Sequence, residues 1–197
     1  SGRLALAHPE APVSPHLRVR MGLDDGRELR FVDPRKFGRL WLLRDPGQVL
    51  GDLGPEPLDE AFTAEAFHAR LAGRRARIKS LLLDQRFLAG VGNIYADEAL
   101  YLAGVHPLRR ACGLSLEEAQ RLHRSLRAVL REAIGHGGTT LAAYRQPDGS
   151  PGEHQHFLWV FRRAEEPCPR CGTQVVRTVV GGRGTYFCPQ CQPFQDG

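Results

Sequence analysis

Four of the chain's five cysteines form two Cys-x-x-Cys pairs near its end, Cys168 with Cys171 and Cys188 with Cys191. The short turn of each pair directs both sulfurs at one metal ion, and the sixteen residues between the pairs are enough for a hairpin that brings the pairs together. Two structural disulfides are the alternative, although such bridges are typical of chains richer in cysteine. The spacing therefore predicts one structural Zn²⁺ per chain, held by the four thiolates.

The segment between the cysteine pairs has the pattern of a β-hairpin. Two β-prone runs, 174–180 and 185–187, flank the glycine-rich stretch 181–184, which carries Arg183 at its tip. From the first to the last of the four cysteines there are three arginines and no acidic residue. Because a hairpin with only positive charge is suited to phosphate groups, we expect a zinc-pinned arm that presents Arg183.

Composition and charge bound the class of protein. The 197 residues, 42% hydrophobic and 25% charged, are typical of a globular chain with a real core. The net charge of +5 favours a polyanionic partner. The sequence contains no run of eighteen apolar residues and no basic leader, so we expect neither a membrane span nor a signal peptide. The remaining thiol, Cys112, predicts a reducing compartment, the cytoplasm, and no role of its own.

Residues 1–45 have the pattern of β-structure. The alternating run 17–23, the turn 24–27 and the returning run 28–32 predict a hairpin, and the apolar run 40–43 predicts a further strand. The loop 33–39 between them carries Arg35, Lys36 and Arg39 around Phe37. Two interpretations remain open: a charged surface turn with Phe37 folded into the core, or a DNA-facing loop with Arg35 on phosphate and Phe37 wedged between bases.

The rest of the chain is mainly helical after a linker at 46–58 that is rich in proline and glycine. Apolar spacing predicts helices over 62–71, 78–83 and 94–102, with Thr63 and Asn93 as caps. A capping box at Ser115 begins the longest helix, which ends at His136. We expect His123 and His136 to be surface residues, since neither has a second metal ligand at suitable spacing. A long polar loop follows over 139–153, and the apolar run 157–161 predicts a strand.

Four stretches together resemble the bacterial formamidopyrimidine-DNA glycosylases. They are Asp33–Gly38 (Asp-Pro-Arg-Lys-Phe-Gly), Leu53–Leu58 (Leu-Gly-Pro-Glu-Pro-Leu), Gly90–Glu98 (Gly-Val-Gly-Asn-Ile-Tyr-Ala-Asp-Glu) and the terminal zinc hairpin. The likeness extends over essentially the whole chain, and Gly-Val-Gly-Asn-Ile-Tyr upstream of such a hairpin is its most specific part. It implies an α+β protein with a partial β-sandwich, a helix–two-turns–helix domain and a C-terminal four-cysteine zinc finger hairpin, with double-stranded DNA bound between the halves.

This resemblance assigns the parts of the chain. Residues 1–45 would be the second half of an N-terminal β-sandwich, 46–58 a linker, 59–153 the helix–two-turns–helix DNA-binding domain and 154–197 the zinc finger hairpin. The loop 139–152 matches the family's loop that closes over the damaged base.

The same resemblance implies an activity. The family removes oxidised purines, chiefly 8-oxoguanine and formamidopyrimidines, from DNA by flipping the base out of the duplex, and it cleaves the backbone through a Schiff base. We therefore expect a base-excision-repair DNA glycosylase and AP lyase, acting as a monomer in the bacterial cytoplasm at the nucleoid. On the matching positions, Asn93 and Arg183 grip the phosphates beside the flipped nucleotide, and Arg183 also assists the second, δ, elimination. The other DNA contacts fall on His16, Arg35 and Arg74, with Phe37 as the wedge.

Several family features have no counterpart in these residues. The family's nucleophile is an N-terminal proline amine followed by a glutamate, and the match places both before Ser1, so we expect the 197 residues alone to be inactive. His154 stands where an aromatic residue is usual, and Phe161-Arg162-Arg163 replaces Tyr-Gly-Arg. Two alternatives stay open: a non-catalytic DNA-binding fragment, and an oxidised-pyrimidine glycosylase of the endonuclease VIII type.

Overall fold

The computed structural model describes residues 2–142 and 144–194. The chain forms two compact units, one of residues 1–45 with 133–157 and the other of residues 46–132 with 158–197. The four-part division expected from the sequence stays a prediction. Ser1 of the predicted sheet, residue 143 of the predicted loop and residues 195–197 of the predicted zinc domain lie outside the described residues.

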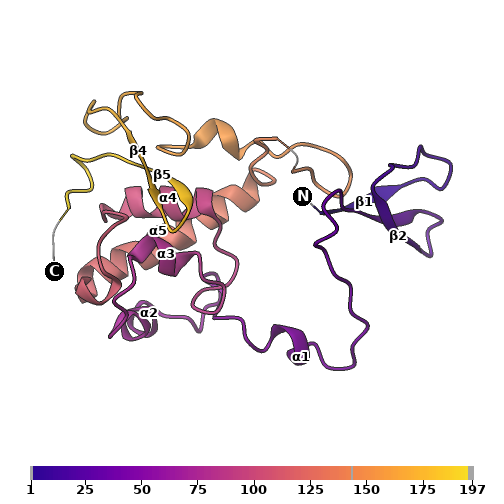
Figure 1. Ribbon diagram of the computed structural model, residues 1–197, viewed down its shortest axis with the longest axis horizontal. Coiled ribbons are helices and arrows are strands. Elements are labelled where there is room, and N and C mark those ends of the chain that lie inside the picture. Colours follow the sequence, from indigo (N-terminus) through magenta and orange to yellow (C-terminus); the bar gives the residue numbers. More distant parts are fainter. Residues whose placement is uncertain (1, 143, 195–197) are drawn as a thin grey trace. The chain divides into compact units, whose positions relative to one another are not determined.

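The first unit contains a three-stranded antiparallel sheet (Figure 1). Its strands are β1 (Arg3–Ala7), β2 (Leu17–Gly22) and β3 (Glu28–Val32), in the order β1-β3-β2. The predicted hairpin of β2 and β3 is confirmed, with a register shift between Leu17 and Val19. The buried Arg30 guanidinium donates to four backbone carbonyls between His8 and Pro12, and so holds the β1–β2 connection against the sheet.

The strand predicted at 40–43 is wrong. Among the described residues this segment pairs with no strand, and Leu40, Trp41 and Leu42 are exposed. An apolar run has strand propensity, but it becomes a strand only where a neighbouring backbone satisfies its amides and carbonyls.

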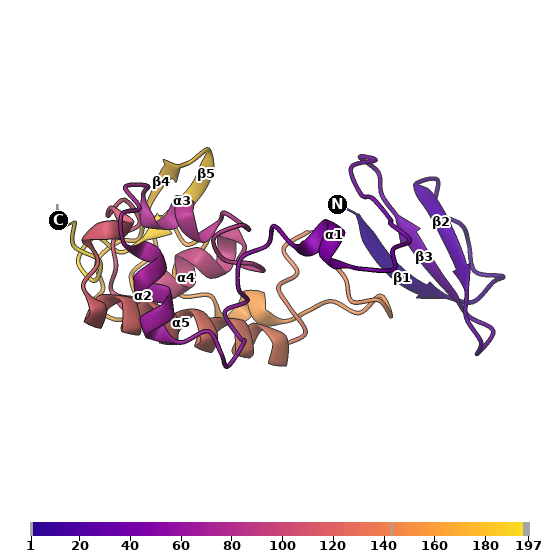
Figure 2. The ribbon, with the colours of Figure 1, turned by 90° about the horizontal axis from the view of Figure 1, so that it is seen from below.

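The second unit is built on helices (Figure 2). After the short α1 (Gly47–Leu50) in the predicted linker come α2 (Ala64–Leu71), α3 (Ile78–Leu82), α4 (Asn93–Ala103), the 3₁₀ turn η1 (Ala111–Gly113) and α5 (Leu116–Gly135). Thr63 caps α2 as predicted, its hydroxyl accepting from the Ala66 amide at 3.2 Å. The apolar faces of α2 to α5 form one core whose fully buried members include Phe67, Leu82, Leu100 and Leu122.

The longest helix begins and ends where the sequence predicts. The Glu118 amide donates to the Ser115 hydroxyl at 3.2 Å, and the Glu118 carboxylate accepts from the Ser115 amide at 2.9 Å, which completes the capping box. After Gly135, Gly137 and Gly138 take positive φ angles of 66° and 89° and turn the chain away. Within the described ranges, no helix combines the length and the apolarity needed to cross a bilayer.

The predicted C-terminal hairpin is formed by β4 (Val176–Val180) and β5 (Arg183–Phe187). The strand predicted at 157–161 is wrong, because this stretch is the end of the 3₁₀ turn η2 (His154–Phe157) and a series of bends. The buried Glu98 carboxylate accepts from the amides of Trp159, Val160 and Phe161 at 2.7 to 3.0 Å. These amides converge on one side chain, whereas a strand would direct them alternately to its two sides.

Candidate nucleic-acid interface and zinc site

The four cysteines of the two pairs meet at one point. All four sulfurs lie within 4.8 Å of one another, and three of the separations are 3.8 Å (Cys168–Cys191), 3.5 Å (Cys171–Cys188) and 3.5 Å (Cys171–Cys191). A tetrahedral Zn²⁺ with Zn–S bonds of about 2.3 Å places its sulfurs about 3.8 Å apart, whereas a disulfide needs about 2.05 Å. The prediction of one structural zinc site is confirmed, and the disulfide alternative is excluded.

Groups outside the cysteines support both knuckles. The Tyr101 hydroxyl lies 3.3 Å from the Cys168 sulfur, where it can donate to a thiolate. Buried Gln192 accepts from the Cys188 amide at 3.0 Å and donates to the Val105 carbonyl at 2.9 Å. The zinc site is therefore anchored to α4 and to Val105, just after that helix, by hydrogen bonds.

The hairpin turn consists of Gly181 and Gly182, both with positive φ angles, 57° and 74°. Val180 pairs with Arg183 across this two-residue turn, so Arg183 is the first residue of β5 and not the tip of the turn. Its side chain is exposed. Two successive residues in the left-handed conformation are typical of a tight hairpin turn, and glycine adopts this conformation readily. The turn therefore fixes the position of Arg183 at the start of β5.

One face of α4 contacts the β4–β5 hairpin near its N-terminal end and the zinc site near its C-terminal end. Asn93, Asp97 and Tyr101 are spaced by four residues and therefore lie on one side of the helix. Asn93 Nδ2 donates to the Gly184 carbonyl at 3.0 Å, Asp97 Oδ2 accepts from the Tyr186 amide at 3.0 Å, and Tyr101 contacts Cys168. The hairpin lies across α4 accordingly (Figure 1). This stripe joins the arginine-bearing turn to the zinc site.

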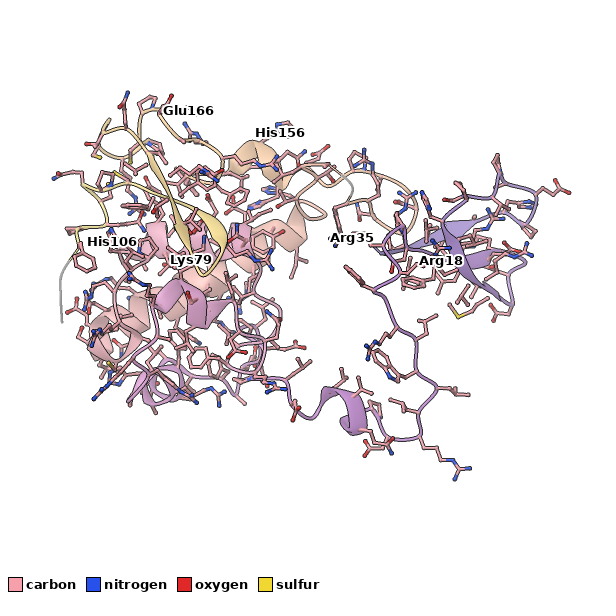
Figure 3. All side chains as sticks on the ribbon, viewed as in Figure 1. Arg18, Arg35, Lys79, His106, His156 and Glu166 are labelled. Carbon is pink, nitrogen blue, oxygen red and sulfur yellow. The ribbon has the colours of Figure 1, made fainter. Side chains whose placement is uncertain are left out.

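A buried ion pair reinforces the same contact. Lys79 Nζ lies 2.7 Å from Asp97 Oδ1, and both side chains are inaccessible to solvent. The ammonium also donates to the Gly184 carbonyl at 3.0 Å and to the Thr185 hydroxyl at 2.7 Å, beneath the hairpin (Figure 3). Burial lowers the pKa of Lys79 and raises that of Asp97, while their mutual attraction opposes both shifts. Three hydrogen-bond acceptors for the ammonium offset its desolvation.

Asn93 was predicted as the N-cap of α4, and this is wrong. Gly92 occupies the cap position without a side-chain hydrogen bond, and Asn93 is the first residue of the helix. The Asn93 amide group is held instead by Gly184, next to Arg183. Its Oδ1 atom is buried without a hydrogen-bond partner in the structure. The structure thus brings Asn93 and the backbone of the Arg183 turn together, at the N-terminus of α4.

Arg74, the other predicted DNA contact of this unit, is exposed just after α2. Its backbone is fixed on both sides: its amide donates to the Leu71 carbonyl at 3.0 Å, and its carbonyl accepts from the Cys112 amide at 2.9 Å. Cys112 itself is exposed and distinct from the zinc ligands. The side chain of Arg74 is free to reach solvent from a rigid backbone.

In the first unit, the Asp33 carboxylate organises the predicted cationic loop. It accepts from the Gly38 amide at 2.7 Å and from the Arg35 amide at 3.2 Å, and these hydrogen bonds lower its pKa. Phe37 is 77% exposed, so the interpretation that buries it in the core is wrong. The Arg35 guanidinium lies 5.4 Å from the centre of the Phe37 ring. His16 is exposed, and its carbonyl accepts from the Asp33 amide at 3.0 Å.

Two histidines are not the surface residues that the sequence predicts. His123 is buried, with its Nε2 atom 2.8 Å from the Phe62 carbonyl oxygen. His136 is half-buried, with its Nδ1 atom 3.1 Å from Nδ1 of His154. Sequence reasoning also missed Lys79 and Asp97 as partners. The spacing of Asn93, Asp97 and Tyr101 on one helix face was the available signal.

Comparison with known families finds three matches along the chain. Residues 1–40 match the formamidopyrimidine-DNA glycosylase N-terminal domain, residues 53–145 match the formamidopyrimidine-DNA glycosylase H2TH domain, and residues 165–193 match the zinc finger found in FPG and IleRS.

Individual proteins are similar over nearly the whole chain. The formamidopyrimidine-DNA glycosylase of Symbiobacterium thermophilum is 49% identical over 100% of the chain and 66% of its own length, and that of a Roseiflexus species is 48% identical over 98% and 71%. A crystal structure of a Lactococcus lactis FPG variant with a Fapy-dG containing DNA superposes with a TM-score of 0.88, at 37% identity, covering 98% of the chain and 72% of that protein. The chain thus spans about two thirds to seven tenths of the length of these relatives.

Proposed function

The chain belongs to the formamidopyrimidine-DNA glycosylase family, and from this premise we propose that the intact protein is a base-excision-repair DNA glycosylase and AP lyase that removes oxidised purines. It would flip the damaged base out of the duplex and cleave the glycosidic bond and the backbone through a Schiff base. The nucleophilic amine would be supplied by the part of the family's length that the 197 residues do not cover. We place this activity in the bacterial cytoplasm, with the protein acting as a monomer at the nucleoid.

The observation that carries this proposal is the hydrogen bond from the Asn93 side chain to the Gly184 carbonyl. It places an amide side chain at a helix N-terminus next to the exposed guanidinium-bearing residue of the hairpin turn. Helix N-terminal amides favour anions, and arginine binds phosphate oxygens through charge-assisted hydrogen bonds. Asn93 and Arg183 would therefore hold the phosphates that flank a flipped nucleotide, and Arg183 would also assist the δ-elimination.

The remaining predicted DNA contacts have suitable exposure within their own units. His16, Arg35 and Arg74 would contact the phosphate backbone, which fixes orientation and carries no base information. Phe37 would insert beside the base left unpaired by flipping, since an exposed ring on a rigid loop can replace the lost stacking.

Replacing Arg183 tests the phosphate clamp, by which we mean the proposed grip of Asn93 and Arg183 on the phosphates beside the flipped nucleotide. In the full-length protein, Arg183→Ala should weaken binding to a duplex with an abasic-site analogue by about 10-fold or more, because a hydrogen bond to a charged group is worth roughly 1.5–3 kcal/mol. The slope of log affinity against log salt should fall by about one unit. Arg177→Ala is the matched control, since Arg177 is exposed on β4 of the same hairpin. Equal binding by the two variants, measured by fluorescence anisotropy, would refute the clamp.

Borohydride trapping distinguishes the hypothesis of a glycosylase and AP lyase from that of a DNA-binding fragment without catalytic activity. Borohydride reduces the Schiff base between a protein amine and the deoxyribose to a stable amine. We expect a covalent complex with an 8-oxoguanine duplex from the full-length protein and none from the 197 residues alone. Absence of trapping by the full-length protein would leave only the DNA-binding function. Faster excision of oxidised pyrimidines in a parallel panel would overturn the purine assignment.

A further inference from the structure

Two histidines face each other where α5 ends and η2 begins, in the first unit. Nδ1 of His136 and Nδ1 of His154 are 3.1 Å apart, and the two rings are inclined by 28° with their centroids 5.4 Å apart. Without a cation, one ring must donate its Nδ1 proton to the other. The two Nδ1 atoms are thus close enough to share one proton or to bind one metal ion.

We propose that His136 and His154 form a second metal site, which binds a divalent transition cation such as Zn²⁺, Ni²⁺ or Cu²⁺ in place of the shared proton. Imidazole nitrogens suit these cations. With metal–nitrogen bonds of about 2.05 Å, two ligands of one tetrahedral ion lie about 3.3 Å apart. The observed 3.1 Å is within a few tenths of an ångström of this value, so binding requires ring rotation and little backbone movement.

The surroundings hold both ligands in place. The His136 ring stacks on Phe157, with centroids 4.1 Å apart and planes inclined by 17°. His154 is only 2% exposed. The backbone on either side is tied by the Glu153 amide donating to the His136 carbonyl at 2.9 Å and the His154 amide donating to the Gly138 carbonyl at 3.0 Å. Ligands restrained in this way lose less conformational entropy when they bind an ion.

Charge and access also suit a cation. Glu132 precedes His136 by four residues in α5, so its carboxylate lies on the same face of that helix. His136 lines an open surface hollow with Gln146, Ser150 and Glu153. A cation can reach the pair from this side, and water can fill its remaining coordination positions.

A bound cation would act on the long loop. The loop 137–153 begins after His136 and ends before His154. A cation bound to both histidines would therefore link the two ends of the loop. Gly152 already approaches the Gly138 carbonyl so closely that an added Cβ would overlap it. The cation would therefore replace the Nδ1–Nδ1 hydrogen bond with two metal bonds at a point where the two ends of the loop are in contact. The displaced Nδ1 proton would pass by way of water to Nε2 of the same ring, so that both imidazoles bind as neutral ligands.

The test counts bound zinc by mass spectrometry after dialysis of the tag-free, zinc-loaded full-length protein against micromolar Zn²⁺. The wild type should hold two ions per chain, and His136→Gln and His154→Phe should each hold one. Phenylalanine is a suitable replacement at 154 because the family usually has an aromatic residue there. If His154→Phe misfolds, His136→Gln still tests the site, because it removes the other ligand. His156→Gln is the control, because His156 is exposed on the same 3₁₀ turn (Figure 3); it should retain two ions.

A spectroscopic measurement identifies the ligands. Co²⁺ added after mild chelation has left one zinc ion per chain, in the four-cysteine site, should give the weak d–d bands of a nitrogen and oxygen site, without thiolate charge transfer, and the bands should vanish in both histidine variants. One zinc per chain in the wild type would overturn the proposal. So would two ions in every variant, since the second ion would then lie elsewhere. Neither result would affect the glycosylase assignment, which rests on different residues.

Discussion

Replacing Asp97 by asparagine tests what holds the hairpin on the helices. The substitution keeps the shape of the side chain and an acceptor for the Tyr186 amide, but it removes the charge opposite Lys79. The ammonium stays buried with only the Gly184 carbonyl and the Thr185 hydroxyl as strong partners. The perturbation therefore isolates an uncompensated buried charge from any loss of packing.

The expected loss of unfolding free energy is large. At 2.7 Å and an effective dielectric constant of about 20, two unit charges attract by roughly 6 kcal/mol. Part of the loss is offset, because the Gly184 carbonyl and the Thr185 hydroxyl still accept hydrogen bonds from the ammonium. Since both side chains are fully buried, no discount for solvent applies, and we expect a loss of about 3–5 kcal/mol, as for other broken buried pairs.

Urea unfolding of the zinc-loaded protein measures this loss, and hydrogen exchange locates it. Amides of 176–187 should exchange faster in Asp97→Asn, while those of the α5 core should change less. Glu117→Gln is the matched control, because it breaks an exposed pair with Arg121 at 2.8 Å and should cost less than about 0.5 kcal/mol. A loss below about 1 kcal/mol for Asp97→Asn, or unchanged exchange in the hairpin, would refute the reasoning.

Three further substitutions have defined outcomes. Arg162 has a φ of 62°, so Arg162→Gly should raise the free energy of unfolding by about 1 kcal/mol in urea titrations, by relieving left-handed strain; a decrease would contradict this. Ser115→Ala should cost about 1 kcal/mol in the same assay through loss of the capping box, and an unchanged midpoint would show that the cap contributes nothing. Cys171→Ser should lower the zinc of the four-cysteine site to near zero after mild chelation, with loss of hairpin protection in hydrogen exchange; retention of that zinc would show that three thiolates suffice.

Local patterns predicted the parts of the fold whose causes are local. The alternation in β2 and β3, the cap at Thr63 and the capping box at Ser115 each depend on residues a few positions apart. The zinc site was predictable because metal ligands have fixed spacing. The segments 40–43 and 157–161 were predicted wrongly as strands, since their state depends on whether a distant partner, such as Glu98, takes their amides.

The candidate site, like these two segments, depends on contacts between residues that are distant in the sequence. Asn93 and Arg183 were predicted from motifs, but the hydrogen bond that joins their segments spans 91 residues of sequence. Lys79 gave no local signal at all, because a lysine reveals its role only through the group that faces it. His154 and Arg162, by contrast, were both visible as departures from the family. The sequence did not indicate that His136 faces His154, whereas the positive φ of Arg162 fits the glycine of the family's Tyr-Gly-Arg segment.

The two lysines of the chain have a practical consequence for chemical labelling. Lys36 is exposed in the loop beside Phe37, whereas Lys79 is sealed beneath the hairpin and ion-paired. An amine-reactive reagent should therefore modify Lys36 at once and Lys79 only when the hairpin lifts. The rate at which Lys79 is acylated would report how often the β4–β5 hairpin, which carries Arg183, detaches from the helices. Bound DNA should lower this rate.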